Sequence, residues 1–350
     1  MLSIRSSRCG LVAAATLGLS TALAHADTAS STLAGHGASS HAPIGVMGDH
    51  LHKQGEWMLS YRAMDMAMDG LLDGSDQVSA ATVTGTMMAP GRYTVAPTRM
   101  EMTMQMLGAM YAPTDRVTLM AMVPYTTLDM DHVTRMGRGF TTRSSGWGDV
   151  KLGGLIGLYR SPDDSRQLHL NLGVSLPTGS IDEKDDTPAM ADAKLPYSMQ
   201  LGSGSYDLLP GITYQSYVGA YNWGAQLSAT LPTGRNDNDY RLGNTAVLTS
   251  WISRHVNKAF AYSLRATIES QGKIDGRRSD LNPAMVTTAD TDNYGGDRMS
   301  LSWGINSYIP AGALKGHRFA LEFTLPVYQN LNGIQLEREP HLSAGWQLAF

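Results

Sequence analysis

The chain has 350 residues, a net charge of −4 at pH 7, 37 glycines, 15 tyrosines and one cysteine, Cys9. This mild acidity offers no basic surface for nucleic acid, and a single cysteine cannot form a disulfide within the chain. Beyond the N-terminus no stretch approaches the roughly 20 consecutive apolar residues of a membrane-spanning helix. The composition therefore leaves a soluble β-sandwich or a membrane β-barrel.

The N-terminus has the pattern of a secretory signal peptide. Two arginines precede an apolar run over 11–23, and the small-x-small sequence Ala24-His25-Ala26 follows that run. We therefore predict a signal peptide over 1–26, whose removal takes away the single cysteine and leaves no thiolate for a metal.

Residues 27–56 lack strand alternation and are rich in alanine, serine and glycine. The stretch "HAPIGVMGDHLH" within them holds three histidines. We predict a leader that lies either in the periplasm or inside the lumen of a barrel, and the pattern does not choose between these places.

From residue 57 onward, short runs of alternating polarity predict about twelve β-strands. Each is about as long as the 9–11 residues that a tilted strand needs to cross a bilayer, or slightly longer. The predicted strands are 57–68, 98–111, 116–127, 147–160, 166–177, 206–218, 222–232, 241–255, 258–270, 297–309, 318–329 and 341–350.

The connections between these strands alternate between short and long along the whole chain. Outer-membrane barrels show this alternation because tight turns face the periplasm and extended loops face the outside. The short links are 112–115, 161–165, 219–221, the region of Asn257 and 310–317; the long links are 69–97, 128–146, 178–205, 233–240, 271–296 and 330–340. We predict an all-β fold, a transmembrane antiparallel up-and-down β-barrel of about 12 strands over 57–350.

The last ten residues, "HLSAGWQLAF", alternate strictly and end on Phe350. A final strand with a terminal phenylalanine resembles the C-terminal assembly signal of bacterial outer-membrane barrels. The predicted location is the bacterial outer membrane. The predicted partners are outer-membrane lipid, lipopolysaccharide and the barrel assembly machinery, together with a small-molecule or metal-ion solute.

Within most strands one face is apolar and the other polar, as in "RFALEFTLPVY" over 318–328. Since lipid cannot hydrate a polar side chain, apolar rows are predicted to face out and polar rows to face the lumen. The predicted lumen-lining residues are Arg62, Glu101, Asp149, Lys151, His169, Asp207, Arg265, Glu269, Arg298 and Glu322. Such a lumen suits a narrow solute path, or its charges pair and close the bore. Strand 241–255 alternates too poorly to be oriented.

Methionine is concentrated in the first third of the chain, where sixteen of the 21 methionines lie between Met47 and Met136. In "RMEMTMQM" over 99–106, four methionines alternate with Arg99, Glu101, Thr103 and Gln105. A charge near the bilayer midplane costs about 2–4 kcal/mol. The pattern therefore predicts that this methionine row faces lipid.

Other methionines are predicted to face the lumen, and further methionines and histidines lie in the leader and in the loop "DMDHVTRM". Thioethers with imidazoles suit Cu(I), and thioethers alone also suit Ag(I). The candidate metal ligands are Met64, Met66, Met68, Met120, Met122, Met130, His132, Met136, His41, Met47, His50 and His52. The alternative is a mobile apolar patch that binds no metal, and no other cofactor is predicted.

Catalytic patterns are weak in this sequence. His341 and Ser343 share a strand face but have no flanking motif, and no G-x-S-x-G, H-E-x-x-H or phosphate-binding loop occurs. We therefore predict no enzymatic activity and no catalytic residues.

Three segments carry a resemblance to a known family. "GWGDVKLGGLIGLY" over 146–159, "LHLNLGVSLPTGS" over 168–180 and a second "LPTG" at 231–234 resemble the bacterial outer-membrane proteins grouped as "putative MetA-pathway of phenol degradation". The resemblance implies a transporter-like barrel and uptake of aromatic compounds, and the methionine-rich first third departs from the general pattern. The sequence thus predicts an outer-membrane channel for small solutes, aromatic compounds among them, with a copper- or silver-binding protein of metal homeostasis as the alternative.

Overall fold

The computed structural model of the protein describes residues 37, 38 and 40–350. The predicted signal peptide and the first part of the predicted leader lie outside the described residues. None of the helices in the described part of the chain is long and apolar enough to cross a membrane.

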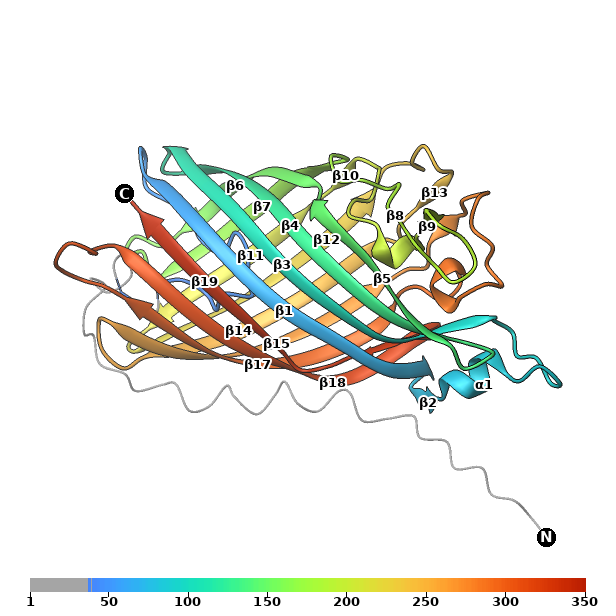
Figure 1. Cartoon of the computed structure of the whole chain (residues 1–350). Coiled ribbons are helices and arrows are strands. Elements are labelled where there is room, and N and C mark those ends of the chain that lie inside the picture. The colour runs from blue at the N-terminus through green and yellow to red at the C-terminus, as the bar shows by residue number, and fades with distance from the viewer. Residues whose placement is uncertain (1–36, 39) are drawn as a thin grey trace, which may run out of the picture.

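Twelve antiparallel strands form one closed sheet (Figure 1). The first and last of them pair side by side, with Met58 opposite Ala349 and Asp65 opposite Leu342. The strands are, in barrel order, β1 (Trp57–Gly74), β3 (Val95–Thr114), β4 (Val117–Thr134), β6 (Val150–Arg160), β7 (Arg166–Leu176), β11 (Gly211–Val218), β12 (Tyr221–Pro232), β14 (Thr245–His255), β15 (Phe260–Gln271), β17 (Gly296–Tyr308), β18 (His317–Arg338) and β19 (His341–Ala349). The predicted up-and-down barrel is confirmed; closure lets every strand pair on both sides, as the bilayer requires.

The smaller elements gather at the end of the barrel that lies opposite the C-terminus, to the right in Figure 1. By the loop rule for outer-membrane barrels this end is extracellular, and the end with tight turns is periplasmic. These elements are β2 (Asp76–Val78), α1 (Ala80–Thr84), β5 (Gly139–Trp147), β8 (Lys184–Asp185), β9 (Ala193–Lys194), η2 (Tyr197–Met199), β10 (Asp207–Leu208), β13 (Tyr240–Arg241), β16 (Asp275–Gly276) and η3 (Thr287–Ala289).

Apolar side chains cover the outside of the barrel wall. On β18, Leu321 and Phe323 are 46% and 44% exposed, whereas Glu322 between them is 1% exposed and faces the lumen. The ambiguous strand β14 follows the same rule, because Leu248 and Ile252 lie outside and Trp251 is buried inside. The predicted assignment of apolar rows to lipid therefore holds for these strands.

The prediction for the row Met100 to Met106 is wrong. Met100 and Met106 are only 4% and 8% exposed, while the side chain of Glu101 is 60% exposed. The methionines of this row face the lumen, and Glu101, predicted to line the lumen, lies on the outer surface.

The reason for this error is the length of the strands. β3 spans 20 residues, more than the roughly 9–11 that cross a bilayer. On the outside, Tyr61 donates to Gln105 at 3.2 Å, and Tyr125 packs edge-on against Trp147 at 5.3 Å between ring centroids. These side chains form the aromatic border at which the hydrocarbon layer ends. Outward residues beyond the border, Glu101 included, stand in water.

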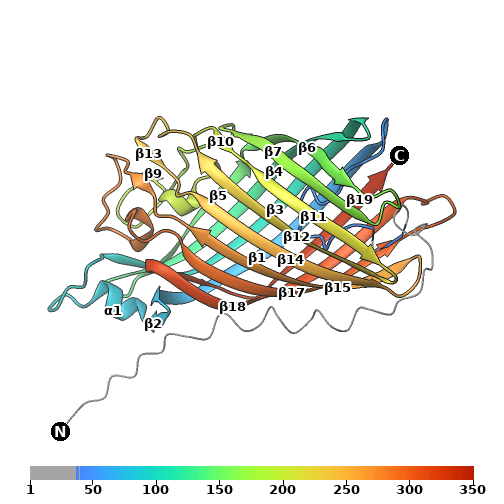
Figure 2. The same ribbon diagram turned by 180° about the vertical axis from the view of Figure 1, so that it is seen from behind.

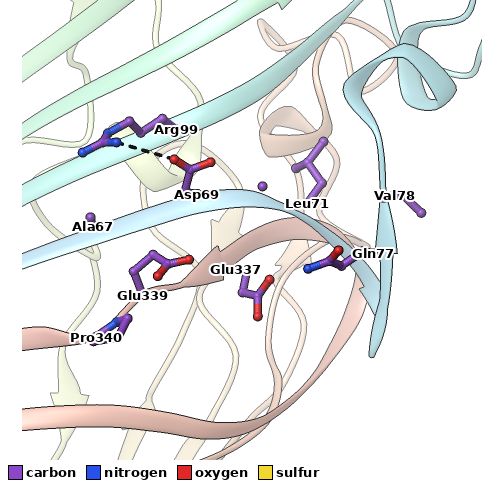
Figure 3. A pocket seen from close by; sticks show the side chains of 10 residues that line it. Ala67, Asp69, Leu71, Gln77, Val78, Arg99, Glu337, Glu339 and Pro340 are labelled. Atoms are coloured by element: carbon purple, nitrogen blue, oxygen red, sulfur yellow. Dashed lines mark hydrogen bonds and ion pairs between the residues drawn. The ribbon is translucent and has the colours of Figure 1, made fainter.

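The outer surface beyond the aromatic border is polar and ion-paired (Figure 3). Arg99 contacts Glu101 at 2.7 Å and Asp69 at 3.5 Å. A pocket beside this group is lined by further acidic residues, Glu337 and Glu339. Exposed pairs of this kind contribute little to stability, but they identify the surface as water-facing.

Two predicted long loops are instead strand extensions. Residues 330–340 complete a hairpin: the chain turns at Gly333, whose φ of 64° favours glycine, and then pairs with β1, Leu336 opposite Leu71. Residues 128–146 form the hairpin of β4 and β5. Both segments escaped prediction because they alternate less regularly than the lipid-facing parts of the strands.

Because the two faces of β3 have different surroundings, we expect matched substitutions on them to change the free energy of unfolding by different amounts. Met100→Gln should lower the free energy of unfolding by about 2 kcal/mol, because it buries an amide among apolar side chains. Glu101→Gln should leave it nearly unchanged, since that side chain is in water. Urea unfolding of the refolded barrel measures both, and equal losses would contradict the assigned facing.

Candidate functional site

Methionines from three neighbouring strands share one face of the lumen. They stand directly opposite one another across the strands, as Met66 does with Met102 and Met64 with Met104. Opposed side chains have Cβ atoms about 4.5–5.5 Å apart, so neighbouring methionine side chains are within reach of one another. We call this surface the methionine face; it consists of Met58, Met64, Met66, Met68, Met100, Met102, Met104, Met106, Met110, Met120, Met122 and Met130.

At its extracellular end the methionine face joins a buried apolar cluster. Met100 and Met130 pack there with Tyr93, Leu195 and Met199, which come from the loops. Tyr93 is held in place by its hydroxyl, which donates to Asp290 at 2.7 Å. The loops therefore fold inward over the upper end of the face and extend its apolar surface.

Above this cluster lies a pocket of about 830 Å³, which we call the mouth pocket. His132 and Phe140 form part of its wall and stack with their rings nearly parallel, 4.8 Å apart. Leu195 lines the pocket and also belongs to the apolar cluster below. The remaining apolar lining includes Met87, Val95, Met136, Met190, Leu281, Met285 and Val286. The mouth pocket is thus apolar and contiguous with the methionine face.

The described part of the leader lies inside the periplasmic half of the barrel. Residues 40–54, the plug, are visible as the blue segment within the strands near the C-terminal end in Figures 1 and 2. The carbonyl of Gly48 accepts hydrogen bonds from Asn171 at 2.8 Å and His169 at 3.0 Å. The carbonyl of Met47 accepts from Gln226 at 2.9 Å. The plug is therefore fixed to the wall by its own backbone.

Glycine is required at position 48. Its φ is 59°, and a Cβ there would lie 2.9 Å from the Asn171 amide nitrogen. Glycine permits both this left-handed conformation and the close approach to the wall.

Apolar contacts complete the seat of the plug. Val46 packs on Trp251 of β14, and Leu51 packs against the cluster of Met58, Met110 and Leu155. Since Met58 and Met110 are the periplasmic end of the methionine face, that face runs from the apolar cluster at the mouth down to the plug.

The plug also gathers three histidines and an aspartate. The rings of His41 and His50 are 3.9 Å apart, and those of His50 and His52 are 4.7 Å apart. The Asp49 carboxylate lies 3.0 Å from His50 Nδ1 and accepts from the backbone of Ala42 at 2.7 Å. Burial lowers the pKa of His41 well below its ordinary value and that of His52 to about 3, so both rings are neutral at pH 7.

Ion pairs line the part of the lumen formed by β15, β17 and β18, and they reach the methionine face, since Arg338 stands opposite Met68. Arg265 and Glu322 form a double hydrogen bond, with 2.6 Å for the shorter contact. Glu269 contacts both Arg298 at 3.2 Å and Arg338 at 3.1 Å. Four of the predicted lumen charges, Arg265, Glu322, Glu269 and Arg298, thus form ion pairs along the barrel wall. This agrees with the alternative that lumen charges pair with one another.

The other predicted lumen residues have individual partners. Asp149 accepts from the backbone nitrogens of Gly179 and Ser203, and Asp207 accepts from a serine hydroxyl. Arg62 stands opposite Met106, and Lys151 opposite Met122, both on the lumen side.

The twelve predicted metal ligands fall into three separate places. His41, Met47, His50 and His52 belong to the plug. Met64, Met66, Met68, Met120 and Met122 belong to the methionine face, Met68 at its extracellular end, and Met130, His132 and Met136 belong to the mouth. Sequence reasoning left Asp49 out of the plug cluster and Met100 to Met106 out of the lumen; the adjacency of Asp49 to His50 was the available signal for the first.

The closed barrel with its apolar outer belt defines an outer-membrane β-barrel, here with a plug in its lumen. The family model described as "Putative MetA-pathway of phenol degradation" matches residues 87–280, more than half of the chain. The protein belongs to this family and to the bacterial outer membrane, as predicted. No curated protein shows a significant match to the sequence.

Solved structures share the fold at low sequence identity. The COG4313 outer membrane channel from Pseudomonas putida F1 superposes with a TM-score of 0.59 and 13% identity, over 87% of this chain and 99% of that one. The TodX monoaromatic hydrocarbon channel, in a ΔS2 mutant, gives 0.45 and 10% identity over 85% and 90% of the two chains. The transport unit of the autotransporter AIDA-I from Escherichia coli gives 0.45 and 13% over 91% and 96%. Only the first of these is similar enough to support the fold.

The position of the plug in the lumen predicts that it limits the conductance of the barrel. Deletion of residues 40–52 should raise the single-channel conductance in planar bilayers several-fold, because it removes the segment bonded to His169, Asn171 and Gln226. Arg143→Gln, on the outer surface, is the control and should change nothing. An unaltered conductance after the deletion would show that the plug does not limit the bore.

Proposed function

We propose that the protein is an outer-membrane channel through which small apolar solutes, aromatic compounds among them, cross the lipopolysaccharide barrier. The proposal rests on the run of apolar side chains that leads from the mouth pocket through the buried cluster to the methionine face. Leu195, Met100 and Met130 are closely packed in that cluster, so a solute passes only when they move apart. Its lower end contacts Leu51 of the plug, so a solute on this path reaches the plug.

The dimensions and the chemistry of the path suit such solutes. A dry cavity of about 150 Å³ can hold benzene, and the mouth pocket measures about 830 Å³. Methionine is unbranched and polarizable, so a face built of methionines can re-pack around rings of different shapes. The ion pairs of β15, β17 and β18 bind one another, whereas Arg62 and Lys151, opposite Met106 and Met122, border the methionine face with charge.

The comparisons support the same class of function. The family takes its description from phenol degradation, and the solved relative with the TM-score of 0.59 is described as an outer membrane channel. An aromatic solute for this chain is our extension of the family description.

The C-terminus supports the barrel assembly machinery as a partner. Phe350 exchanges backbone hydrogen bonds with Trp57 at 2.8 and 2.9 Å, and its side chain is 65% exposed at the closing seam of the barrel. A terminal aromatic ring in that place is accessible to the machinery that closes barrels.

Passage should depend on the apolar character of the methionine face. Met66→Asn with Met102→Asn should reduce toluene uptake into lipopolysaccharide-containing outer-membrane vesicles on the order of tenfold, the effect of about 1.4 kcal/mol on partitioning. The matched control, Met66→Leu with Met102→Leu, keeps the face apolar and should retain most of the uptake. Equal uptake by all three proteins would refute the path.

A second candidate function, handling of Cu(I) or Ag(I), rests on the facing pairs of thioethers. Soft metals accept thioether ligands, and Met66 opposite Met102 offers two of them. The leucine variant separates the two functions, because it keeps the apolar path but removes both thioethers of this pair. Anaerobic Cu(I) binding that is present in the native protein and lost in this variant would establish the second function.

A further inference from the structure

We infer that the plug is a metal-binding element in which His41, Asp49 and His50 hold one divalent transition-metal ion. The ligand atoms of these three side chains all lie within 4.8 Å of one another. All three belong to the plug, so the site is separate from the methionine face and does not depend on the proposed solute.

The geometry is close to that of a bound ion. Ligands of a tetrahedral ion with bonds of about 2.0–2.2 Å stand roughly 3.4 Å apart. The Asp49–His50 contact is 3.0 Å, and all three ligand atoms lie within 4.8 Å of one another. Small rotations of the two imidazole rings bring the three atoms to a common centre.

Two of the plug histidines are buried and have unsatisfied nitrogens. His41 is 8% exposed and its Nδ1 has no hydrogen-bond partner, while His52 is 5% exposed and its Nε2 has none. Buried polar atoms are nearly always partnered, so such exceptions need a physical reason. A metal ion bound at His41 gives that buried imidazole the partner it lacks, and His52 lies edge-on against His50 beside the site.

The surrounding charges restrict the kind of ion. Asp49 is the carboxylate of the cluster, and Arg62 and Arg318 act electrostatically on this group of residues. Their repulsion acts on any divalent cation. Ca²⁺ and Mg²⁺, which prefer oxygen ligands, find only one carboxylate here to offset it, whereas ions that bond strongly to imidazole find two further ligands. Two imidazoles with one carboxylate favour Zn²⁺ or Cu²⁺.

Metal binding would determine the shape of the plug. The ligands come from both ends of the turn between residues 41 and 50, and Arg318 donates to the carbonyl of Gly37 just before it. An ion at this place closes the turn and holds Gly48 against the wall. The structure thus assigns to the metal the role of a cross-link that keeps the plug folded in the lumen.

The test is a Zn²⁺ titration of the complete refolded barrel after chelator treatment, by calorimetry with a competing chelator. We expect one Zn²⁺ per barrel, and a loss of affinity of about 100-fold or more in His41→Gln with His50→Gln and in Asp49→Asn. His341→Gln, which alters a half-buried histidine outside the plug, should bind as the native protein does. Heat-modifiable migration confirms that each variant has a folded barrel.

A second readout identifies the ligands independently of affinity. Cu²⁺ added to the native barrel should show nitrogen hyperfine coupling from at least two imidazoles in its electron paramagnetic resonance spectrum, and the double variant should not. Absence of stoichiometric binding in the native protein, or binding that survives in the double variant, would overturn the inference. Neither result bears on toluene uptake, so the proposed function is tested separately.

Discussion

The place where the hydrocarbon layer ends along the strands governs the rest of this structure. Inside that layer every backbone group must be bonded within the protein, which forces closure between β1 and β19, and every outward side chain must be apolar. Beyond the aromatic border at Tyr61 and Tyr125 water removes the second requirement. The same strands continue there with acidic and basic residues on the outside and methionines on the inside.

This extension of β1, β3 and β4 gives the lumen two unlike sides. One side is the methionine face, which continues through the buried cluster into the mouth pocket. The other side carries ion pairs such as Arg265 with Glu322. The plug closes the periplasmic half and touches both sides, through Leu51 on the first and through Trp251 beside the second. A solute path is therefore apolar in the extracellular half of the barrel. It ends at the plug, which must move before a solute can pass.

The sequence predicted the strands and their alternation, which contact with lipid requires. It did not predict features that depend on how deep a residue lies in the membrane or on contacts between residues far apart in the chain. All twelve strands were predictable because a lipid-facing row must alternate with a lumen row, as on β18. Alternation shows only which residues share a face of a strand. Whether Met100 or Glu101 faces outward could be predicted only by knowing that both lie beyond the hydrocarbon layer. The seat of the plug depends on bonds between Gly48 and His169, residues far apart in the chain, which no local pattern reports.

The facing of β3 is the measurement that tests the account most directly. In a Cys9→Ser background, Thr103→Cys and Met104→Cys would be treated with a bulky membrane-impermeant maleimide on intact outer membranes. We expect rapid labelling at position 103, on the water-exposed outer surface, and protection at position 104, inside the lumen. Labelling of 104 with protection of 103 would place the methionines outside and contradict the apolar path.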